Sequence, residues 1–589
     1  MTPEAWLVLA VVVGLLMVLI RDMASPAASM VAAMVIVLVT GVVTPQQALI
    51  GFSNPAPVTV AALYVLARAV QKTGALTPLM RGVLGTGDSP RASLARLVVP
   101  TAASSAFLNN TPIVAMLLPQ VRSWCEERGL SPSKYLMPLS FAALLGGVVT
   151  VIGTSTNIVV SGLLGQEGMG EFGFFELAIV GLPIAVLGAI LIVALAPVLL
   201  PERRSVSSDF DDGARQFLME MRVDHGGALD GRPVEEAGLR HLSSVFLATI
   251  ERSGSLIAPV SPDEILRGGD RLAFVGRVKH VVDLPAIRGL TPEATDHILD
   301  LDTVSARYFE AVIGAESPLV GTTLRAASFR SKYQGVVMAI HRAGQLVDAK
   351  LGEVELRVGD TMLILSDHGF HSRWSDRSDF LVVSQPGASP NVNGPKALLV
   401  ALVTAGIIGL ASTGVVPILQ ASLLGAIVLL GGRVLTPGEA RSAVELDVIV
   451  LIAAAFGLAN AVSESGLADV FASGIVGALA GFGSVGILAG IIIATVILTG
   501  LVTNNAAALL MFPVAVATAQ QAGLDPRGFA VAIAVSASVD FLTPIGYQTN
   551  TMVYGPGGYR FGDYSRLGAP LTLMVVVTLL VVIPIAWPM

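Results

Sequence analysis

Charged residues are scarce in this sequence. They make up 13% of the 589 residues, whereas a soluble protein carries about 25%, and 53% of the residues are hydrophobic. A single cysteine, Cys125, excludes a disulfide framework and a cysteine-rich metal site. The net charge of −7 comes without a basic block, which argues against binding to nucleic acid. Lipid is therefore the expected surrounding of most of the chain.

Histidine is confined to one region. All seven histidines lie within residues 202–392, so the rest of the sequence lacks the commonest metal ligand and general base. They are His225, His241, His280, His297, His341, His368 and His371. No nucleophile–base pair, metal-binding cluster or phosphate loop is apparent either, so the sequence does not indicate an enzyme.

Charge is concentrated in the same region. Residues 202–392 hold 48 of the 79 Asp, Glu, Lys and Arg residues, and the other 398 residues hold 31. This split predicts a soluble insert between two membrane parts, residues 1–201 and 393–589. The stretch from Met1 to Ile20 lacks the basic segment and cleavage site of a signal peptide, so we interpret it as an uncleaved first span.

Ten apolar stretches are long enough to cross a bilayer, which takes roughly 17–25 residues. In the first half they lie near 5–22, 26–44, 55–73, 135–163 and 174–200. In the second half they lie near 396–413, 415–433, 447–466, 528–556 and 567–588. The sequence therefore predicts a membrane all-α fold with five spans in each half.

Two further apolar stretches, 93–120 and 486–520, have polar centres. These centres are Leu108-Asn109-Asn110-Thr111-Pro112 and Val502-Thr503-Asn504-Asn505. An Asn pair is costly in hydrocarbon unless protein buries it or it lines a cavity. We predict two re-entrant hairpins, each entering and leaving on one side of the membrane. The alternative that both stretches are plain extra spans stays open.

Lysine and arginine predict which side of the membrane each hairpin faces. Eight basic residues surround the first hairpin, whereas none lies between Ser442 and Pro526 around the second. The eight are Arg68, Lys72, Arg81, Arg91, Arg96, Arg122, Arg128 and Lys134. Arg203 and Arg204 follow the fifth span, so the insert is predicted to be cytoplasmic. The first hairpin then opens to the cytoplasm, and the second hairpin and both termini face outside.

Motifs of the first half recur in the second half at nearly one offset. The first match is between Leu66-Ala-Arg-Ala-Val70 and Leu458-Ala-Asn-Ala-Val462. The second is between Ser105, Asn109, Asn110 and Pro119 of the first half and Thr499, Thr503, Asn504 and Pro513 of the second. The third is between Ile152-Gly153-x-x-Thr156-Asn157 and Ile545-Gly546-x-x-Thr549-Asn550. Because five spans per half is an odd number, the second copy is predicted to be inverted. Inverted repeats with broken helices are typical of transporters, with the site at the repeat interface.

The hairpin tips and the loops that match them carry amides and hydroxyls but no Lys or Arg. The first set is Ser105, Asn109, Asn110, Thr111 and the loop 153–157, and the second is Thr499, Thr503, Asn504, Asn505 and the loop 546–550. Free N–H groups of helices that begin inside the membrane suit an oxyanion. Oxygen atoms at a chain break suit an alkali cation such as sodium. A cation at each tip with an anion between them is therefore predicted.

One carboxylate, Asp540, breaks the symmetry of the two sets. It precedes the second loop, and the first half has no carboxylate there. A buried carboxylate in a membrane binds a proton or a cation, or it caps or pairs locally. The sequence leaves these roles of Asp540 open.

The tips resemble the Ser-Asn-Thr signatures of the divalent anion/sodium symporter family, in the ion transporter superfamily. The resemblance rests on Ser105-x3-Asn109-Asn110-Thr111 and Thr499-x3-Thr503-Asn504-Asn505, and on loops similar to the family's Gly-Thr-Pro-Pro-Asn loops. It covers both membrane parts. The sequence departs from the pattern at Asn109, Thr503 and Asn505, and it lacks the loop prolines.

The resemblance implies a homodimer with an elevator motion, two sodium sites and a shared site for sulfate, citrate or a dicarboxylate. The anion is then expected at Asn109, Asn110, Thr111, Thr156, Thr503, Asn504, Asn505 and Thr549. Sodium is expected at Ser105, Asn110, Gly153 and Asn157, and at Thr499, Asn504, Gly546 and Asn550. Apart from these coupling ions, no cofactor is implied.

The insert is itself duplicated. At an offset of 90, Ile250-Glu-Arg252-x-Gly254 matches Ile340-His-Arg342-x-Gly344, and Leu266-Arg-x-Gly269-Asp270 matches Leu356-Arg-x-Gly359-Asp360. Alternating apolar residues at 271–275 and 361–365 predict strands. The layout resembles two TrkA-C (RCK C-terminal) domains, residues 202–296 and 297–392, as in bacterial and algal sulfate-type permeases. A dimer-forming or structural role and a regulatory small-ligand site are both open, and no Gly-rich loop supports NAD or ATP binding.

The sequence thus favours sodium-coupled symport of sulfate or a dicarboxylate across a bacterial inner membrane. Transport of potassium, of an oxyanion such as arsenite, or coupling to protons are alternatives within transport. A membrane ligand sensor is the alternative of another class. A potassium filter would need stacked backbone carbonyls, and a sensor would not need a matching site in both halves.

Overall fold

A computed structural model describes residues 1–21, 23–75, 89–203, 218–239, 245–252, 255–257, 260–276, 287–292, 306–314, 317–342, 345–347, 349, 351–367, 369–374, 377, 379–384, 394–544 and 546–587. Several residues used above lie outside these ranges: Arg81, Arg204, His241, Gly254, His280, His297, Gly344, His368 and Ile545, with the domain junctions at 296–297 and 392–393. The described parts are mostly helical, and the sheets are confined to the insert.

The first half consists of helices that mostly begin at a capped proline. They are α1 (Pro3–Ile20), α2 (Pro26–Val39), α3 (Pro45–Leu49), α4 (Pro55–Thr73), α6 (Pro90–Ser105), α7 (Asn110–Glu127), α8 (Leu136–Gly147), α9 (Ser155–Gln166) and α10 (Ala178–Leu199). Thr2, Ser25, Thr44, Asn54 and Ser89 each accept a backbone hydrogen bond just before a proline. Such a side chain satisfies a free N–H group, and proline fits the first helical position.

The second half repeats this order of elements. They are α14 (Gly394–Ser412), α15 (Ile418–Gly431), α16 (Pro437–Ala443), α17 (Leu446–Glu464), α18 (Leu467–Leu479), α19 (Gly483–Thr499), α20 (Asn504–Gln521), α21 (Pro526–Ser538), α22 (Gln548–Tyr554) and α23 (Phe561–Ala586). Even a local detail recurs, because the short helices α3 and α16 both begin with a capping box, Thr44–Gln47 and Thr436–Glu439.

Seven helical stretches of the described residues are long and apolar enough to cross a membrane. They are Pro3–Ile20, Pro45–Thr73, Ala178–Leu199, Gly394–Ser412, Leu446–Glu464, Leu467–Thr499 and Phe561–Ala586. Large apolar side chains such as Leu398 and Leu402 of α14 are exposed on their outer faces. The protein is thus a multi-pass helical membrane protein with a sheet-containing insert.

Two of the predicted continuous spans are wrong. The stretch 135–163 is broken into α8 and α9, and the stretch 528–556 into α21 and α22. The average hydropathy of each stretch is apolar, so each was predicted as one continuous span although the polar loops 153–157 and 546–550 lie inside them. The breaks fall at 148–154 and 539–547, next to the loops assigned to the site. A further element, α18, was not predicted, because its 13 residues are fewer than a span needs.

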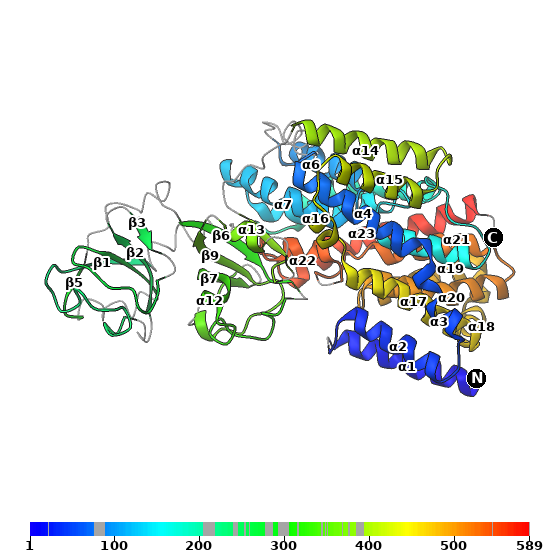
Figure 1. The fold of residues 1–589 in the computed structure, drawn as a ribbon. Coiled ribbons are helices and arrows are strands. Elements are labelled where there is room, and N and C mark those ends of the chain that lie inside the picture. The colour runs from blue at the N-terminus through cyan, green and yellow to red at the C-terminus, as the bar shows by residue number, and fades with distance from the viewer. Residues whose placement is uncertain are drawn as a thin grey trace.

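The two halves pack on each other reciprocally. Helix α2 packs on α17, and its counterpart α15 packs on α4, which is the counterpart of α17. In the same way α9 packs on α20, while α22 packs on α7. In Figure 1, α1 and α2 accordingly lie on the opposite side of the helical part from α14 and α15. Exchange of this kind is expected of repeats related by a two-fold axis, and the inverted orientation in a membrane stays a prediction.

The insert contains two five-stranded antiparallel sheets with the same strand order. The first, in the order β3-β2-β4-β1-β5, has β1 (Leu218–Val223), β2 (Val245–Arg252), β3 (Ser255–Ile257), β4 (Arg271–Gly276) and β5 (Leu290–Pro292). The second, in the order β10-β6-β9-β7-β8, has β6 (Ala306–Val312), β7 (Gly335–Arg342), β8 (Gln345–Leu346), β9 (Thr361–Asp367) and β10 (Val382–Ser384), with the short helices α12 (Phe329–Tyr333) and α13 (Phe370–Trp374). The predicted strands at 271–275 and 361–365 are therefore present.

The motifs that suggested the duplication hold the same position in both sheets. Arg252 forms an ion pair with Asp270 at 2.8 Å, and Arg342 forms one with Asp360 at 2.7 Å. The register of each sheet also shifts at one equivalent place, between Leu247 and Thr249 and between Val337 and Ala339. The two copies thus share one fold, and their assignment as TrkA-C domains stays a prediction.

The second sheet of the insert docks on the helical part. In Figure 1 this sheet lies between the first sheet and α22. Arg122 of α7 forms a buried ion pair with Glu310 of β6. A Cβ on Gly555 would lie 2.1 Å from Thr361 Oγ1, so the turn after α22 touches β9 closely. The insert thereby contacts the two helices α7 and α22.

His341 of β7 is buried close to this interface. Neither ring nitrogen has a hydrogen-bond partner among the described residues. Burial, and then the charge of Arg122, lowers the pKa of His341 to about 4. The ring is therefore neutral at physiological pH and adds no charge to the contact between Arg122 and Glu310.

Because both partners are buried, we expect Arg122 and Glu310 to depend on each other. Arg122→Met or Glu310→Met alone leaves an unpaired buried charge, which costs about 3–5 kcal/mol of stability. The double variant should lose much less than the sum of the two, measured by thermal unfolding of the purified protein in detergent. Arg373→Met is the control, because its ion pair with Asp367 is partly exposed and contributes about 0–1 kcal/mol. Additive losses for Arg122 and Glu310 would contradict the pairing.

Candidate functional site

Each predicted hairpin tip is a helix end joined to a helix start by one side-chain bond. Helix α6 ends at Ser105 and α7 begins at Asn110, and Ser105 Oγ donates a hydrogen bond to Asn110 Oδ1 at 2.6 Å. Helix α19 ends at Thr499 and α20 begins at Asn504, and Thr499 Oγ1 donates to Asn504 Oδ1 at 3.2 Å. In each half the structure thus brings together a hydroxyl and an amide of the predicted tip, and Thr499 Oγ1 also lies 2.8 Å from the Ala537 carbonyl oxygen.

Each loop that breaks a helix is held by one asparagine amide. In both halves this amide donates to two backbone carbonyls that the break leaves without helical partners. Asn157 Nδ2 donates to the carbonyls of Gly147 at 3.1 Å and Thr150 at 2.9 Å, and Asn550 Nδ2 donates to those of Asp540 at 2.8 Å and Thr543 at 3.1 Å. These asparagines therefore stabilise the breaks, whatever else they bind.

The tip of one half meets the loop of the other half. Thr111 Oγ1, at the start of α7, donates to Gln548 Oε1 at the start of α22, at 3.2 Å. Ser155 Oγ and Thr156 Oγ1, at the start of α9, both donate to Asn505 Oδ1 at the start of α20, at 3.2 Å. The N-terminal ends of α7 and α22, and those of α9 and α20, thus lie against each other.

Tyr547 joins these two pairs of helix starts. Its hydroxyl accepts a hydrogen bond from Asn110 Nδ2 at 2.7 Å and lies 3.4 Å from Thr154 Oγ1. Thr154 directly precedes α9, and Tyr547 directly precedes α22. Four helix N-termini, two from each half, therefore converge on one place.

Polar groups at this place are left without partners. Helices α9, α20 and α22 begin without a side-chain cap, unlike α1, α2 and α4. Asn504 Nδ2 and Asn157 Oδ1 are buried and have no hydrogen-bond partner among the described residues. One of these is a donor and the other an acceptor. A buried polar atom without a partner costs free energy, so both positions are suited to a ligand.

Not every predicted site residue joins the cluster. Asn109 is partly exposed, Thr503 is exposed, and neither side chain forms a hydrogen bond within the described part of the chain. Gly153 and Gly546 lie where a side chain would not fit: a Cβ would lie 2.5 Å from the Gly147 carbonyl oxygen and 1.6 Å from Asp540 Oδ2, respectively. Asp540 therefore lies against the second loop.

Some contacts of the cluster were not predicted. Tyr547, Gln548 and Ser155 stand inside the repeated loops, so the loop motif was a signal for their place but not for their contacts. Ser140 of α8 had no signal, although its hydroxyl donates to Thr549 Oγ1 at 2.9 Å and Asn550 Oδ1 at 2.8 Å. The residue at the matching position of the second half is apolar, so the repeat did not point to Ser140.

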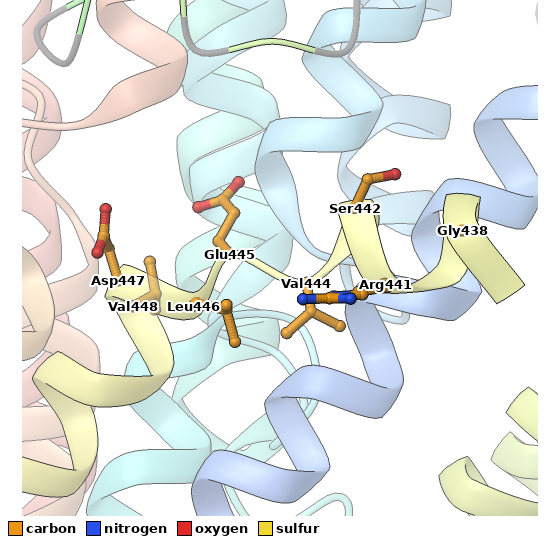
Figure 2. Close-up of a pocket in the computed structure, with 8 residues that line it drawn as sticks. All are labelled: Gly438, Arg441, Ser442, Val444, Glu445, Leu446, Asp447 and Val448. Atoms are coloured by element: carbon orange, nitrogen blue, oxygen red, sulfur yellow. The ribbon is translucent and has the colours of Figure 1, made fainter.

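A separate hollow of about 410 Å³ opens at the surface between α16 and α17, and Figure 2 shows its lining. Its walls are Gly438, Arg441, Ser442, Val444, Glu445, Leu446, Asp447 and Val448. Glu445 and Asp447 project to the same side in this view (Figure 2), and Glu445 accepts a hydrogen bond from Tyr64 at 3.5 Å. None of the predicted site residues lines this hollow, so the cluster at the helix breaks is the stronger candidate.

Titratable metal ligands do not gather at the cluster. Across the residues that the structure describes, no group of three or more His, Cys, Asp or Glu side chains could hold a metal ion. The groups at hand are amides, hydroxyls, backbone N–H groups and the single carboxylate of Asp540. They suit a small oxyanion and alkali cations rather than a transition metal.

Comparison with known proteins gives the chain a family. The sequence pattern of the citrate transporter (CitMHS) family matches residues 15–534 and 478–588. The chain is 35% identical to a candidate sulfur deprivation response regulator of Chlamydomonas reinhardtii, over 96% of this chain and 98% of that protein. It is 33% identical to an uncharacterized transporter of Synechocystis, over 97% and 95% of the two chains. It is 25% identical to sodium/sulfate cotransporter 1 of Chlamydomonas reinhardtii, over 93% and 86%.

The family match spans both helical parts and the insert, and the relatives are similar over almost their whole length. The family match agrees with a fold built of apolar helices around a buried polar cluster. The chain is therefore a member of the citrate transporter family, a multi-pass membrane transporter and not an enzyme.

Proposed function

We propose that the protein is a sodium-coupled symporter of a divalent oxyanion, with sulfate as its first candidate substrate. The observation that supports this most is the convergence of four helix N-termini, two from each half, at a place without Lys or Arg. Among the described residues, the start of α20 carries an unpaired buried donor, Asn504 Nδ2, and the start of α9 carries an unpaired buried acceptor, Asn157 Oδ1. A site with both kinds of group fits the joint binding of an anion and a cation.

The anion site is proposed at the four helix starts. Each free helix N-terminus carries about half a positive charge and exposes N–H donors. Asn110, Thr111, Thr156, Asn504 and Asn505 add side-chain groups at these starts. The contributions of Asn109, Thr503 and Thr549 remain predictions. The Thr549 hydroxyl is buried and accepts a hydrogen bond from Ser140, whereas Asn109 is partly exposed and Thr503 is exposed.

Two sodium sites are proposed, one for each half. Ser105, Asn110, Gly153 and Asn157 surround the first, and Thr499, Asn504, Gly546 and Asn550 the second. Bound cations offset the charge of the anion within a medium of low polarity. A membrane potential contributes about 2.3 kcal/mol per charge per 100 mV, so it favours inward movement of a dianion only with more than two cations.

The names of relatives support the substrate class. Sodium/sulfate cotransporter 1 aligns over 93% of this chain, and the candidate sulfur deprivation response regulator over 96%. The family is named for citrate, which is also an oxyanion bound by hydrogen-bond donors. Sulfate is therefore the first substrate to test, with dicarboxylates and citrate as its competitors.

The proposed mechanism and setting are those that the family resemblance implies. We propose an elevator-type motion in a homodimer, in the plasma membrane of a bacterium. The distribution of Lys and Arg supports a cytoplasmic location for residues 202–392. Within this insert, two TrkA-C-like domains, 202–296 and 297–392, are proposed to hold the dimer or to bind a small regulatory ligand.

Sodium should drive uptake of labelled sulfate into proteoliposomes. The expected result is accumulation with an inward sodium gradient, and only background uptake when potassium or choline replaces sodium. Equal uptake in potassium would contradict sodium coupling. Unlabelled succinate, citrate and arsenite, added in turn, identify the substrate class by competition, and inhibition by succinate but not by excess sulfate would replace sulfate with a dicarboxylate.

The two tip asparagines should be required for uptake. Asn110→Ala and Asn504→Ala each remove an amide from the proposed site, and loss of a hydrogen bond to a charged ligand costs about 1.5–3 kcal/mol, or at least about tenfold in binding. The control is Asn460→Ala on α17, which loses one bond to the Gln47 carbonyl outside the site. Near-normal uptake by both tip variants, at equal protein levels, would overturn the site.

Gly147 should be required for sulfate uptake, because the Asn110 side chain occupies the space that a side chain at position 147 would need. A Cβ on Gly147 would lie 2.5 Å from Asn110 Oδ1, so Gly147→Ala pushes the tip amide away. We expect sulfate uptake to fall at least as far as in Asn110→Ala. Gly474→Ala on α18 is the matched control, since a Cβ there meets no atom within 4 Å. Equal sulfate uptake by Gly147→Ala and Gly474→Ala would show that transport does not depend on the position of the Asn110 amide.

A further inference from the structure

The two helix breaks share one backbone design but differ in one charge. The asparagine that holds the first break donates to the carbonyls of Gly147 and Thr150. At the second break the matching carbonyls belong to Asp540 and Thr543, 393 residues further on. Asp540 therefore occupies the position of Gly147. Where the second half has a carboxylate, the first half has no side chain.

The space that the missing side chain leaves in the first half is filled by the tip. A Cβ on Gly147 would meet the Asn110 amide at 2.5 Å from Oδ1 and 3.0 Å from Nδ2. In the second half, the carboxylate of Asp540 extends from the corresponding backbone position, and the tip amide Asn504 keeps an unpaired Nδ2 among the described residues. The two tips are thus chemically different, although their backbones match.

No basic side chain in the described part of the chain forms an ion pair with Asp540. The residue is 3% exposed, and its carboxylate accepts hydrogen bonds from Leu542 N–H at 3.2 Å and Thr543 Oγ1 at 3.0 Å. Neither donor carries a charge. Within the described residues it forms no ion pair. A buried carboxylate without a positive partner is strongly unfavourable in a medium of low polarity.

Charged groups on the surrounding helices are committed elsewhere. Helices α8, α9, α19 and α20 contain no ionisable side chain. Arg527, the one basic residue of α21, binds Glu176 at 2.5 Å. Asp563 at the start of α23 binds Arg203 at 2.8 Å, and Arg122 of α7 binds Glu310. Arg566 of α23 lies 3.6 Å from Asp563. A proton or a bound cation is then left to neutralise Asp540.

The carboxylate lies where the second cation is expected. A Cβ on Gly546 would lie 1.6 Å from Asp540 Oδ2, so this oxygen sits directly against the loop backbone. Gly546 N–H donates to Thr543 Oγ1 at 3.0 Å, and that hydroxyl donates to Asp540 Oδ2. The chain break thereby supplies an anionic oxygen among neutral ones, which is the kind of ligand set that hard cations prefer.

We propose that Asp540 makes anion binding depend on the cation at the second tip. This inference rests on the proposed sodium-coupled symport. Without the cation, the fixed negative charge repels the anion at the neighbouring helix starts. With the cation bound, the repulsion is cancelled and the uncapped N–H groups at the start of α20 donate hydrogen bonds to the anion. The cation therefore binds before the anion at this tip, whereas the first tip has no fixed charge and imposes no such order.

The test compares anion binding at low and at saturating sodium in purified protein and in proteoliposomes. Sulfate binding is read from thermal stabilisation in detergent, with choline keeping the ionic strength constant. In the wild type we expect sodium to tighten sulfate binding by roughly 100-fold, and in Asp540→Asn by less than about 5-fold, with tighter binding than the wild type in the absence of sodium. Asparagine retains the acceptor for Leu542 N–H, so the local turn is preserved.

Three further variants make the result decisive. Asp540→Glu keeps the charge and should retain strong dependence on sodium, while Asp540→Ser should behave like Asp540→Asn. Asp563→Asn, at a buried carboxylate paired with Arg203, is the matched control and should keep the wild-type dependence. Unchanged sodium dependence in both neutral variants at position 540 overturns the inference.

The remaining outcomes separate the inference from the proposed function. If sulfate binding and uptake by the wild type do not respond to sodium, the proposed sodium symport fails and the inference fails with it. If the wild type responds but neither neutral variant can be purified as a folded protein, Asp540 serves the fold and the inference alone is overturned. Strong dependence in the wild type and Asp540→Glu, with weak dependence in Asp540→Asn and Asp540→Ser, supports both.

Discussion

A helix interrupted inside an apolar fold must satisfy its own free backbone groups, and this requirement organises the protein. At each break an asparagine amide, Asn157 or Asn550, bonds two carbonyls of the interrupted chain. The carbonyls are thereby satisfied within the protein. The N–H groups at the starts of α9, α20 and α22 are not capped by side chains. Because backbone donors remain while these carbonyls are bonded, the free helix starts favour an anion without basic residues, and the carboxylate of Asp540 opposes this at the second break.

The repeat turns two such regions into one. Each half contributes a tip and a loop, but the tip of one half contacts the loop of the other, through Thr111 and Gln548 and through Asn505 and Ser155. Neither half therefore holds a complete site alone. Tyr547 connects the two contacts across the centre. These contacts join the tips and loops of both halves into one unit, which the proposed elevator-type motion would move as a single body.

Much of this arrangement was predictable from sequence, and the rest depends on contacts that sequence does not encode locally. The pairs Ser105–Asn110 and Thr499–Asn504 follow from a repeated spacing, so they were expected. Average hydropathy did not indicate the breaks within 135–163 and 528–556, because the apolar residues on both sides outweigh the polar loops. The breaks depend on backbone bonds to asparagine. Ser140 could not be found, because its contacts with the second loop join residues about 400 positions apart.

Two helices, α7 and α22, connect the insert to the candidate site. Helix α7 begins with Asn110 in the cluster and reaches Arg122, twelve residues or about 18 Å along its axis, where Glu310 of the second sheet binds. Helix α22 begins at Gln548 in the cluster, and the turn after it packs against Thr361. Pro119 lies within α7 between Asn110 and Arg122 and removes one helical hydrogen bond there. A shift of the second sheet therefore acts on Arg122 and on the turn after α22, the far ends of the two helices whose starts meet at Thr111 and Gln548, where the solute is proposed to bind.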